Sequence, residues 1–454
     1  MKQSSMSRRD FVRLGAGAAV AGAVVKSTLL EPAMLDAQPR IFGTGRKIRF
    51  GVIGTGMRGC PILRTAKKLP NADFIALADI YSMHRRAGQE AWGPEGDKVK
   101  TYVDYRELLD RKDIEAVFVA VPDHLHRRIV IDAVNAGKDV YCEKPMSHTV
   151  EDGFAMVEAV KKNKRILQVG SQGASDLLHL KAREIVASGK LGEISLIEAS
   201  SDRNSDFGAW VYPIPKDASP ETIDWKKFIQ DAPDRPYDPY RFFRWRCFND
   251  YGEGQSGDLF VHLLTAIQTI TSINEAPSRA VSAGSLTHFK STRECPDLLV
   301  SLFTYGDVTV KLHGNMNNGW RGGTIIHGKE ATLTMDSDGL TITPQDSQKF
   351  PNPETYAMDG WTSEALAEWM ADWNSKHPYQ YETVAETERY HAAPGYDSNV
   401  DHIGNFLRAV ETRQEVLEDV VFGNHCSIAC HMANHSYYKD TVAHWDAATK
   451  CIKG

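Results

Sequence analysis

A glycine-rich turn between a predicted strand and a predicted helix constrains the fold of this chain more than any other feature. Residues 48–53 form an apolar run that predicts a buried strand. The turn at 54–59 reads Gly-Thr-Gly-Met-Arg-Gly, and the amphipathic stretch at 62–69 predicts a helix directly after it. In this setting, the spacing of the three glycines is the fingerprint of a domain that binds a dinucleotide.

The positions of the turn have predicted roles. Gly54 allows the tight turn, Gly56 lets the backbone approach a pyrophosphate, and Gly59 lets the helix pack closely on the strand. The N-terminus of the following helix favours the negative charge of the phosphates. Met57 and Arg58 lie within the turn, so we predict that all five residues contact the dinucleotide.

An acidic residue ends the next predicted strand, at 74–78. Asp79 stands 25 residues after Gly54, where a carboxylate takes the ribose hydroxyls of the cofactor. A carboxylate there repels a 2′-phosphate, so the sequence predicts NAD rather than NADP. Arg85 and Arg86 lie close behind and favour the opposite preference. The alternative interpretation of Asp79 is the N-cap of a helix.

Further apolar runs and amphipathic stretches alternate along the chain. This pattern predicts an α/β fold with a doubly wound parallel sheet that helices cover on both faces. The predicted strands lie at 116–121, 139–142 and 166–170, with a helix at 124–136.

Composition excludes several classes of protein. The chain has 454 residues, of which 42% are apolar and 25% charged, which is close to a globular average. The net charge of −6 argues against a nucleic-acid partner. Seven cysteines are too few for a disulfide scaffold. At ~100–200 residues per domain, a soluble enzyme of two or three domains remains.

The first 37 residues have the layout of an export signal. The basic start Ser-Arg-Arg-Asp-Phe-Val at 7–12 precedes an uncharged stretch rich in glycine and alanine at 14–25. Paired arginines in this setting are similar to a twin-arginine signal, which predicts the export machinery as a partner and a periplasmic location. Cleavage after Ala37, an uncleaved anchor and a helix of the mature fold are the alternatives.

Several motifs of the chain occur together in one known family. They include Val-Pro-Asp-His-Leu-His at 121–126, Cys-Glu-Lys-Pro at 142–145, Lys-Leu-Gly-Glu-Ile at 190–194, Ile-Asp-Trp at 223–225, His-Ile-Gly-Asn-Phe at 402–406 and Asn434. With these motifs the chain resembles the Gfo/Idh/MocA oxidoreductases over about residues 47–438.

The resemblance implies a second domain with a large, mostly antiparallel open sheet, which commonly forms the interface of homodimers or homotetramers. Short strand patterns at 299–303, 308–312 and 331–335 agree with it. We therefore expect a signal at 1–37, a Rossmann domain at 46–170 and a substrate-binding domain at 171–454.

Oxidation of a hydroxyl needs a base for its proton and a donor that steadies the developing oxyanion. Lys144 follows a predicted strand end, where ligands bind in such sheets. Asp258 and His262 are four residues apart, so they share one face of a helix. The resemblance implies that these three form the catalytic centre. The alternatives are a surface lysine in a salt bridge, an N-cap at Asp258 and a packed core histidine.

The resemblance also implies contacts beyond the catalytic centre. For the cofactor these are Pro122, His124, His126 and Glu143, together with Lys144. For the substrate they are Gln172, Asp258 and His262. Relatives often carry an arginine soon after Gln172, whereas this chain reads Gln-Gly-Ala-Ser-Asp at 172–176. This departure from the family pattern leaves the substrate class open. Arg244 and Trp245 are predicted instead from the aromatic segment at 201–246, because rings with polar tips suit sugar recognition; a packed loop or a dimer arm is the alternative. The segment also holds Tyr212 and Arg246.

His431 and His435 have a spacing that suits zinc, but no metal is expected.

We therefore predict an exported NAD(H)-dependent oxidoreductase that acts on a hydroxyl of a sugar, glycoside or polyol. Its cofactor would stay bound and be recycled by a second substrate. One alternative is a glycosidase that works by transient oxidation and elimination. Another is a non-catalytic sugar-binding protein.

Overall fold

The computed structural model describes residues 33–35, 45–204, 206–320, 322–345, 355–378 and 385–454. The predicted export signal lies outside these ranges except for Ala33–Leu35, so its function stays a prediction. Ala33–Leu35 form strand β1, which pairs in parallel with β16 (Glu388–Ala392). Within the described ranges, no helix has the length and apolar character needed to cross a membrane.

The first sheet has six parallel strands in the order β4-β3-β2-β5-β6-β7. The chain enters at β2, winds outward to β4 and crosses back to β5, which is the doubly wound order. The strands are β2 (Ile48–Ile53), β3 (Ala72–Ala78), β4 (Lys100–Tyr102), β5 (Ala116–Val119), β6 (Asp139–Cys142) and β7 (Leu167–Val169). The predicted strands are confirmed. The short strand β4 was not predicted, because three residues show no periodicity.

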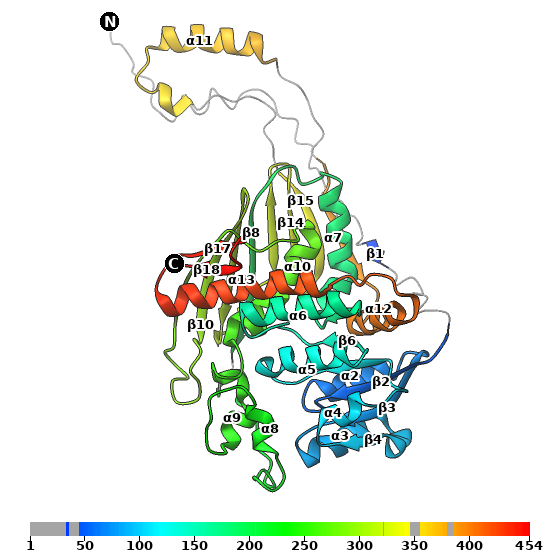
Figure 1. Cartoon of the computed structure of the whole chain (residues 1–454). Coiled ribbons are helices and arrows are strands. Elements are labelled where there is room, and N and C mark those ends of the chain that lie inside the picture. The colour runs from blue at the N-terminus through cyan, green and yellow to red at the C-terminus, as the bar shows by residue number, and fades with distance from the viewer. Residues whose placement is uncertain (1–32, 36–44, 205, 321, 346–354, 379–384) are drawn as a thin grey trace, which may run out of the picture. The chain divides into compact units, whose positions relative to one another are not determined.

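Helices cover this sheet, and every residue of β5, β6 and β7 is buried (Figure 1). Burial on both faces explains why these strands are continuously apolar rather than alternating. The helices in this part of the chain are α2 (Gly59–Ala66), α3 (Ser82–Trp92), η1 (Pro94–Lys98), α4 (Tyr105–Leu109), α5 (Asp123–Asn135) and α6 (Val150–Asn163).

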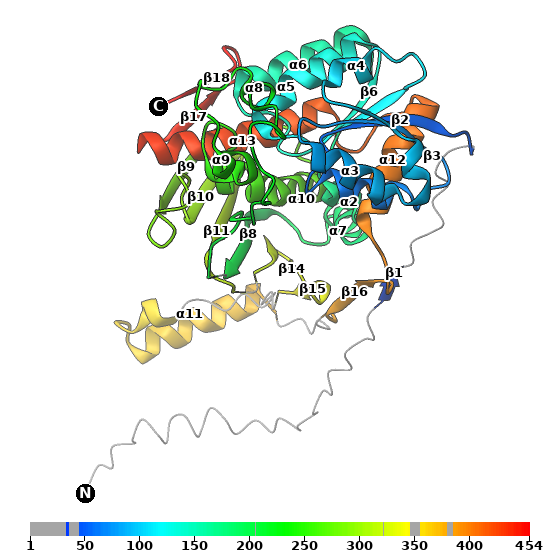
Figure 2. The ribbon, with the colours of Figure 1, turned by 90° about the horizontal axis from the view of Figure 1, so that it is seen from below.

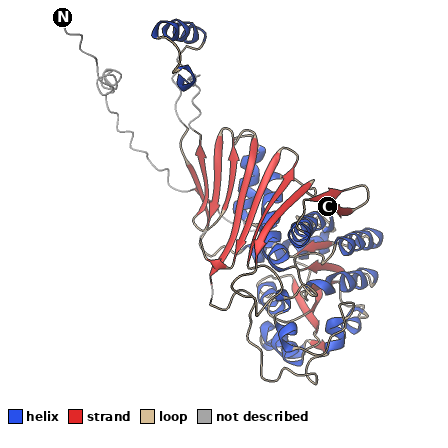
Figure 3. Cartoon of the chain, turned by 90° about the vertical axis from the view of Figure 1, so that its left-hand side faces the viewer, coloured by secondary structure: helices blue, strands red, loops and turns tan. Residues whose placement is uncertain are grey.

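The second sheet has twelve strands among the described residues, and Figure 3 shows it as one broad curved layer. Its order is β1-β16-β15-β14-β13-β8-β11-β10-β9-β17-β18, and β12 pairs with β8. Within the described part of this sheet only β1–β16 and β8–β11 are parallel pairs, so the predicted mostly antiparallel sheet is confirmed. The remaining strands are β8 (Ile194–Asn204), β9 (Arg279–Ser285), β10 (Leu298–Tyr305), β11 (Val308–Asn315), β12 (Asn317–Asn318), β13 (Thr324–Gly328), β14 (Ala331–Asp336), β15 (Gly339–Pro344), β17 (Ala443–Asp446) and β18 (Cys451–Lys453).

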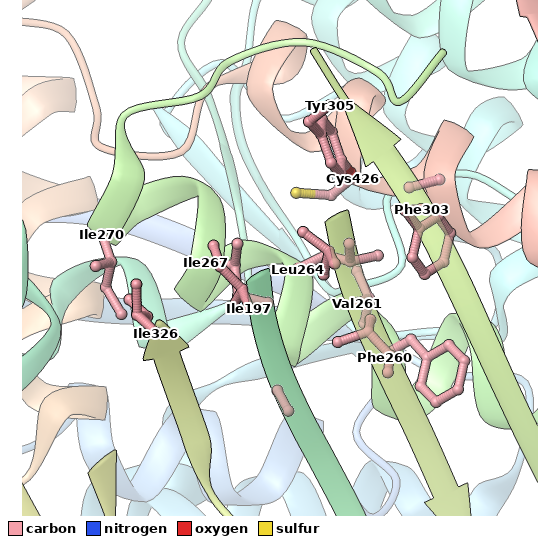
Figure 4. Close-up of a cluster of buried hydrophobic side chains, with 14 of the residues drawn as sticks. Ile197, Phe260, Val261, Leu264, Ile267, Ile270, Phe303, Tyr305, Ile326 and Cys426 are labelled. Atoms are coloured by element: carbon pink, nitrogen blue, oxygen red, sulfur yellow. The ribbon is translucent and has the colours of Figure 1, made fainter. Parts of the chain in front are cut away.

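One face of this sheet carries three long helices: α7 (Leu177–Ala187), α10 (Val261–Thr271) and α13 (Val420–Lys439) (Figures 1 and 2). Along β10 the burial alternates, so that Leu299 and Phe303 are fully buried while Leu302 is 45% exposed. Figure 4 shows Leu264 and Ile267 of α10 packing toward strand residues such as Phe303. This apolar layer fixes α10, which carries His262.

Helix α12 (Ser398–Thr412) joins the core of the first sheet, although it comes from the second half of the chain. The Phe406 ring lies 5.3 Å from the Phe118 ring of β5. His402 bonds the Val169 carbonyl through Nε2 at 2.7 Å and the Ser175 hydroxyl through Nδ1 at 2.8 Å. The predicted boundary at residue 170 stays a prediction, but the first core draws on residues beyond 400.

The other elements are short, except for α11. They are η2 (Gln172–Ser175), α8 (Trp225–Ile229), α9 (Pro239–Phe243), η3 (Trp245–Cys247), the π-helical turn η4 (Ser256–Phe260), η5 (Thr355–Met358) and α11 (Ser363–Lys376). The turn η4 runs directly into α10, and η3 precedes it by eight residues. Together they bring Trp245, Arg246 and Asp258 to the candidate site.

Candidate active site

The glycine-rich turn lies between β2 and α2, and two of its glycines have no space for a side chain. Gly54 has a φ of +87°, and a Cβ there would lie 2.4 Å from the Ala120 carbonyl oxygen. A Cβ at Gly59 would lie 2.1 Å from the Gly54 carbonyl oxygen. Gly56 lies beside the His84 ring, 3.1 Å from where its Cβ would be, and lines the cleft described next. The turn therefore has the geometry that its sequence predicts.

A cleft of about 720 Å³ opens along the carboxyl ends of the parallel strands. In doubly wound sheets, ligands bind at this edge, next to the point where the strand order reverses. Nine of the predicted site residues line it: Gly54, Gly56, Met57, Arg58, Asp79, Pro122, Glu143, Lys144 and Trp245. Residues beyond position 200 also line it, including Tyr212, Phe243 and Arg246.

Asp79 lies at the end of β3 and faces the glycine-rich turn. Its Oδ2 accepts a hydrogen bond from Thr55 N at 2.8 Å, and its Oδ1 accepts one from Tyr81 N at 2.9 Å. Burial alone would raise the pKa of this carboxyl, but the nearby His84 and these two amides hold it below its usual value. Asp79 therefore stays charged. It does not cap α3, whose N-cap is Tyr81, so the alternative interpretation is wrong.

Arg58 and Glu143 form an ion pair on the cleft, with Arg58 Nε 2.6 Å from Glu143 Oε1. The charge of Glu143 raises the pKa of the Arg58 guanidinium, against the opposing effect of burial. The pair joins the glycine-rich turn to the end of β6. Both residues were predicted to contact the cofactor, and the structure places them in direct contact with each other.

Lys144 and Asp258 form a second ion pair, with Lys144 Nζ 2.6 Å from Asp258 Oδ1. Arg246 Nε donates to the same oxygen at 2.9 Å. The three side chains are only 10–16% exposed. Burial would raise the pKa of Asp258, but these two cations hold it far below its usual range. Asp258 lies inside η4 and caps no helix, so the alternative interpretation of Asp258 as an N-cap is also wrong.

His262 lies in the first turn of α10, four residues after Asp258. Burial and the positive charge of Lys144 lower the pKa of its imidazole to about 3, although Asp258 opposes them. The ring is therefore neutral near pH 7. Its hydrogen-bonding capacity is unused within the described ranges.

Seven predicted contact residues are not among those that line the cleft: Gly59, His124, His126, Gln172, Arg244, Asp258 and His262. The side chains of His124, His126 and Arg244 bond backbone carbonyls instead. His124 Nε2 bonds the Phe228 carbonyl at 2.8 Å. His126 bridges the Val121 and Pro145 carbonyls at 2.9 and 2.8 Å. Gln172 lies in η2 and is half-buried with its Oε1 atom enclosed, and Arg244 Nε donates to the Tyr212 carbonyl at 3.0 Å. His126 thus holds together the two loops that carry Pro122 and Lys144.

Arg246 and Asp123 also line the cleft, although no sequence motif predicts a site role for either. Arg246 was named only as part of an aromatic and basic segment. No local signal links it to Asp258, because their contact depends on how η3 and η4 pack.

Among the described residues, no group of three or more His, Cys, Asp or Glu side chains is placed to hold a metal ion. His431 bonds Glu253 Oε1 at 2.5 Å and Ser147 Oγ at 3.3 Å, while His435 bonds the Gly454 carbonyl. The two histidines therefore have separate partners.

One segment in the first half of the chain matches a known family. Residues 48–171 match the family described as an oxidoreductase family with an NAD-binding Rossmann fold, Gfo/Idh/MocA. Inositol 2-dehydrogenase of Salmonella typhimurium is 32% identical over 148 residues, which cover 32% of this chain and 43% of that protein. The enzyme of the same name from Rubrobacter xylanophilus is 34% identical over 167 residues, covering 36% and 46%. The chain thus spans less than half the length of these relatives.

Solved structures match nearly the whole chain. Levoglucosan dehydrogenase in complex with NADH and levoglucosan has a TM-score of 0.63 at 18% identity, covering 88% of this chain and 99% of that one. Aldose–aldose oxidoreductase from Caulobacter crescentus, complexed with glycerol, has a TM-score of 0.62 at 17% identity, covering 88% and 100%. At this identity the likeness shows the fold. Residues 48–171 match the NAD-binding Rossmann fold of the oxidoreductase family.

Proposed function

We propose that this protein is an NAD(H)-dependent oxidoreductase that interconverts a hydroxyl and a carbonyl of a sugar, glycoside or polyol. The observation that carries the proposal is the Lys144–Asp258 ion pair, because Lys144 lines the same cleft as the glycine-rich turn. The names of the relatives support the substrate class, since they act on inositol, on levoglucosan or on aldoses.

The residues present fit a nicotinamide dinucleotide. The turn at Gly54 and Gly56 leaves room for a pyrophosphate at the N-terminus of α2. The charged Asp79 favours ribose hydroxyls over a 2′-phosphate. Arg85 does not offset this preference, because its Nη1 donates to the Asp79 carbonyl at 2.8 Å and it does not line the cleft. The bound cofactor would accept or supply the hydride.

Lys144 would bind the reacting oxygen of the substrate. Its ammonium donates to Asp258 and can donate a further hydrogen bond toward the cleft. Such a cation stabilises the negative charge that develops on the oxygen. Asp258 and Arg246 hold the Lys144 ammonium in place. The neutral ring of His262, one turn away, is the base that the sequence predicts.

Twin-arginine export, a periplasmic location, a retained cofactor and a homodimer or homotetramer belong to the same proposal. The basic start and the apolar stretch of the first 37 residues support export. A retained cofactor would suit an exported enzyme, because free nicotinamide nucleotides are scarce outside the cytoplasm.

The test incubates the protein with NAD⁺ and each member of a panel of inositols, aldoses, alditols and glycosides. The reduction of NAD⁺ and the products formed are both measured. The proposal expects nucleotide reduction with at least one of them, and Lys144→Met should lower the rate ~10²–10⁴-fold. Lys98→Ala, on a lysine that is 76% exposed, is the control and should keep the wild-type rate. Glycoside cleavage without net NADH would favour the glycosidase alternative. If the protein reacts with none of these compounds, the proposal is contradicted.

A further inference from the structure

A second hollow, of about 500 Å³, lies in the large sheet where β8 ends. It is lined by Asn204, Asn318, Gly319 and Trp320, and none of these residues lines the cleft. Asn204 is the last residue of β8, and Asn318 is the last residue of β12, which pairs with β8. The proposed chemistry leaves this hollow unused.

Two glycines hold the backbone beside Trp320 in place. A Cβ at Gly322 would overlap the Ser200 side chain of β8, and a Cβ at Gly323 would overlap the Met335 carbonyl oxygen of β14. Gly322 N also donates to the Trp320 carbonyl at 2.8 Å. The backbone therefore lies directly on the sheet, and a fixed backbone presents the Trp320 side chain in one place.

The Trp320 side chain has the surroundings of a sugar-binding ring. The residue is 75% exposed, and within the described ranges its indole stacks on no other ring. The side-chain amides of Asn204 and Asn318 lie beside it, and neither has a hydrogen-bond partner among the described residues. The flat face of an indole packs on the C–H face of a pyranose, while amides bond its hydroxyls. An apolar protein surface would leave these amides unbonded, which is costly.

Strand β11 connects the hollow to the candidate active site. A Cβ at Gly314 would lie 3.4 Å from the Phe260 ring, so the end of β11 lies against η4, the turn that holds Asp258. Asn318 follows Gly314 by four residues, which span at most ~13 Å at ~3.3 Å per residue. A chain of a few sugar units can therefore reach from one site to the other.

Arg203 lies between the two sites. It is exposed, it pairs in register with Asn318, and it has no ion-pair partner in the part of the chain that the structure describes. Burial lowers the pKa of His262 and raises that of Tyr212, and the positive charge of Arg203 acts on both groups in the lowering direction. Arg203 is thus within electrostatic reach of the candidate site, and its guanidinium can donate to hydroxyls of a ligand that passes it.

We propose that the hollow at Trp320 is a second sugar-binding subsite, so that the substrate is an oligosaccharide rather than a single sugar. The inference rests on the proposed function. The reacting sugar lies at Lys144, the sugar chain passes Arg203, and a further sugar unit stacks on Trp320. Asn204 and Asn318 bond the hydroxyls of that unit. The chemistry at Lys144 is the same for short and long substrates.

The first test measures binding without turnover. The full chain, with no nucleotide added, is applied to an array of oligosaccharides that differ in sugar, linkage and length, together with their monosaccharides. Wild type should bind at least one oligosaccharide more tightly than its monosaccharide. Trp320→Ala should weaken that binding ~10-fold in titrations, whereas Trp320→Phe, which keeps a flat ring, should retain most of it. Trp361→Ala, on another exposed tryptophan, is the control and should bind like wild type.

Two results of this test would overturn the proposal. One is a wild type that binds no oligosaccharide more tightly than its monosaccharide. The other is a Trp320→Ala protein that binds oligosaccharides as tightly as wild type. A change in the mass of the protein in solution on Trp320→Ala would also overturn it, because Trp320 would then contact a second copy of the chain.

The second test compares kcat/KM for the oxidised sugar with kcat/KM for its oligosaccharides. In wild type the longer substrates should be favoured, and Trp320→Ala should reduce this preference ~10-fold. Trp361→Ala should keep the preference. A preference that Trp320→Ala does not change would overturn the subsite and leave the proposed function standing. A protein that binds oligosaccharides through Trp320 but oxidises none would contradict the proposed function and leave the subsite standing.

Discussion

Lys144 Nζ lies 2.6 Å from Asp258 Oδ1, although 114 positions separate the two residues in the sequence. One residue follows the end of β6 in the first sheet, and the other lies in η4 at the start of α10. Arg246 Nε shares the same oxygen at 2.9 Å. A single carboxylate thus pairs with two cations, and the contact fixes the first sheet to the helix that carries His262.

Replacing Asp258 by asparagine should destabilise the fold as well as reduce activity. The change leaves Lys144 and Arg246 without their shared anion, and removal of one partner from a buried ion pair costs about 3–5 kcal/mol. Urea unfolding of both proteins measures the difference. Asp110→Asn, on an exposed carboxyl, should change stability by less than about 0.5 kcal/mol. An Asp258→Asn protein as stable as wild type would show that the network is not structural.

Replacing Gly54 by alanine should abolish nucleotide binding, because its φ is +87° and the new Cβ would lie 2.4 Å from the Ala120 carbonyl oxygen. Gly137 is a matched control, since it has a φ of +80° but no atom within 4 Å of its Cβ position. Gly137→Ala should cost only about 1 kcal/mol and keep nucleotide binding. Isothermal titration with NAD⁺ checks both variants. Equal behaviour of the two would mean that the backbone angle alone matters.

Replacing Asp79 by asparagine should shift the cofactor preference toward NADP⁺. The amide oxygen can still accept the hydrogen bond from Thr55 N, but the charge that repels a 2′-phosphate is gone. We expect the ratio of the dissociation constants for NADP⁺ and NAD⁺ to fall by ~10-fold, which is about 1.4 kcal/mol. Binding titrations with both nucleotides measure this ratio. An unchanged ratio would contradict the role given to Asp79.

Acid should weaken the contact between α12 and β7. Burial lowers the pKa of His402 to about 4, whereas an unfolded histidine titrates near ~6.5. Neutral His402 therefore contributes fully to folding stability above pH ~6.5. As the pH falls toward 4, the free energy of unfolding decreases by up to roughly 3 kcal/mol. His402→Gln should therefore flatten the dependence of unfolding free energy on pH between 7 and 4.5. His288→Gln, on an exposed ring, should leave that slope unchanged. A slope that His402→Gln does not alter would contradict this account.

The first sheet could be predicted because its signals are local. The apolar run at 48–53 and the glycine spacing after it require only near neighbours in the chain. The positive φ of Gly54 and the close approach at Gly59 are the reasons why glycine stands at those positions. The strands at 299–303, 308–312 and 331–335 were predicted for the same reason, since each alternates between a buried and an open face.

The site could be predicted only in part, because its contacts join segments far apart in the chain. The Glu-Lys-Pro motif and the Asp258–His262 spacing singled out Lys144 and Asp258, which the structure brings into contact. The pairing of Arg246 with Asp258 depends on how η3 packs against η4, and the burial of Asp123 depends on Gly252 and Trp245. His124 and His126 follow Pro122 closely in the sequence, but the direction of α5 turns their rings away from the cleft to backbone carbonyls.

The central claim is that the cleft holds NAD(H). The most direct measurement is to purify the full chain, denature it and identify any released nucleotide by mass and absorbance, then titrate the emptied, refolded protein with NAD⁺ and NADP⁺. The account predicts released or rebound NAD(H), with NADP(H) bound more weakly. A protein that releases no nucleotide and binds neither one would contradict the account and favour a sugar-binding protein without redox chemistry.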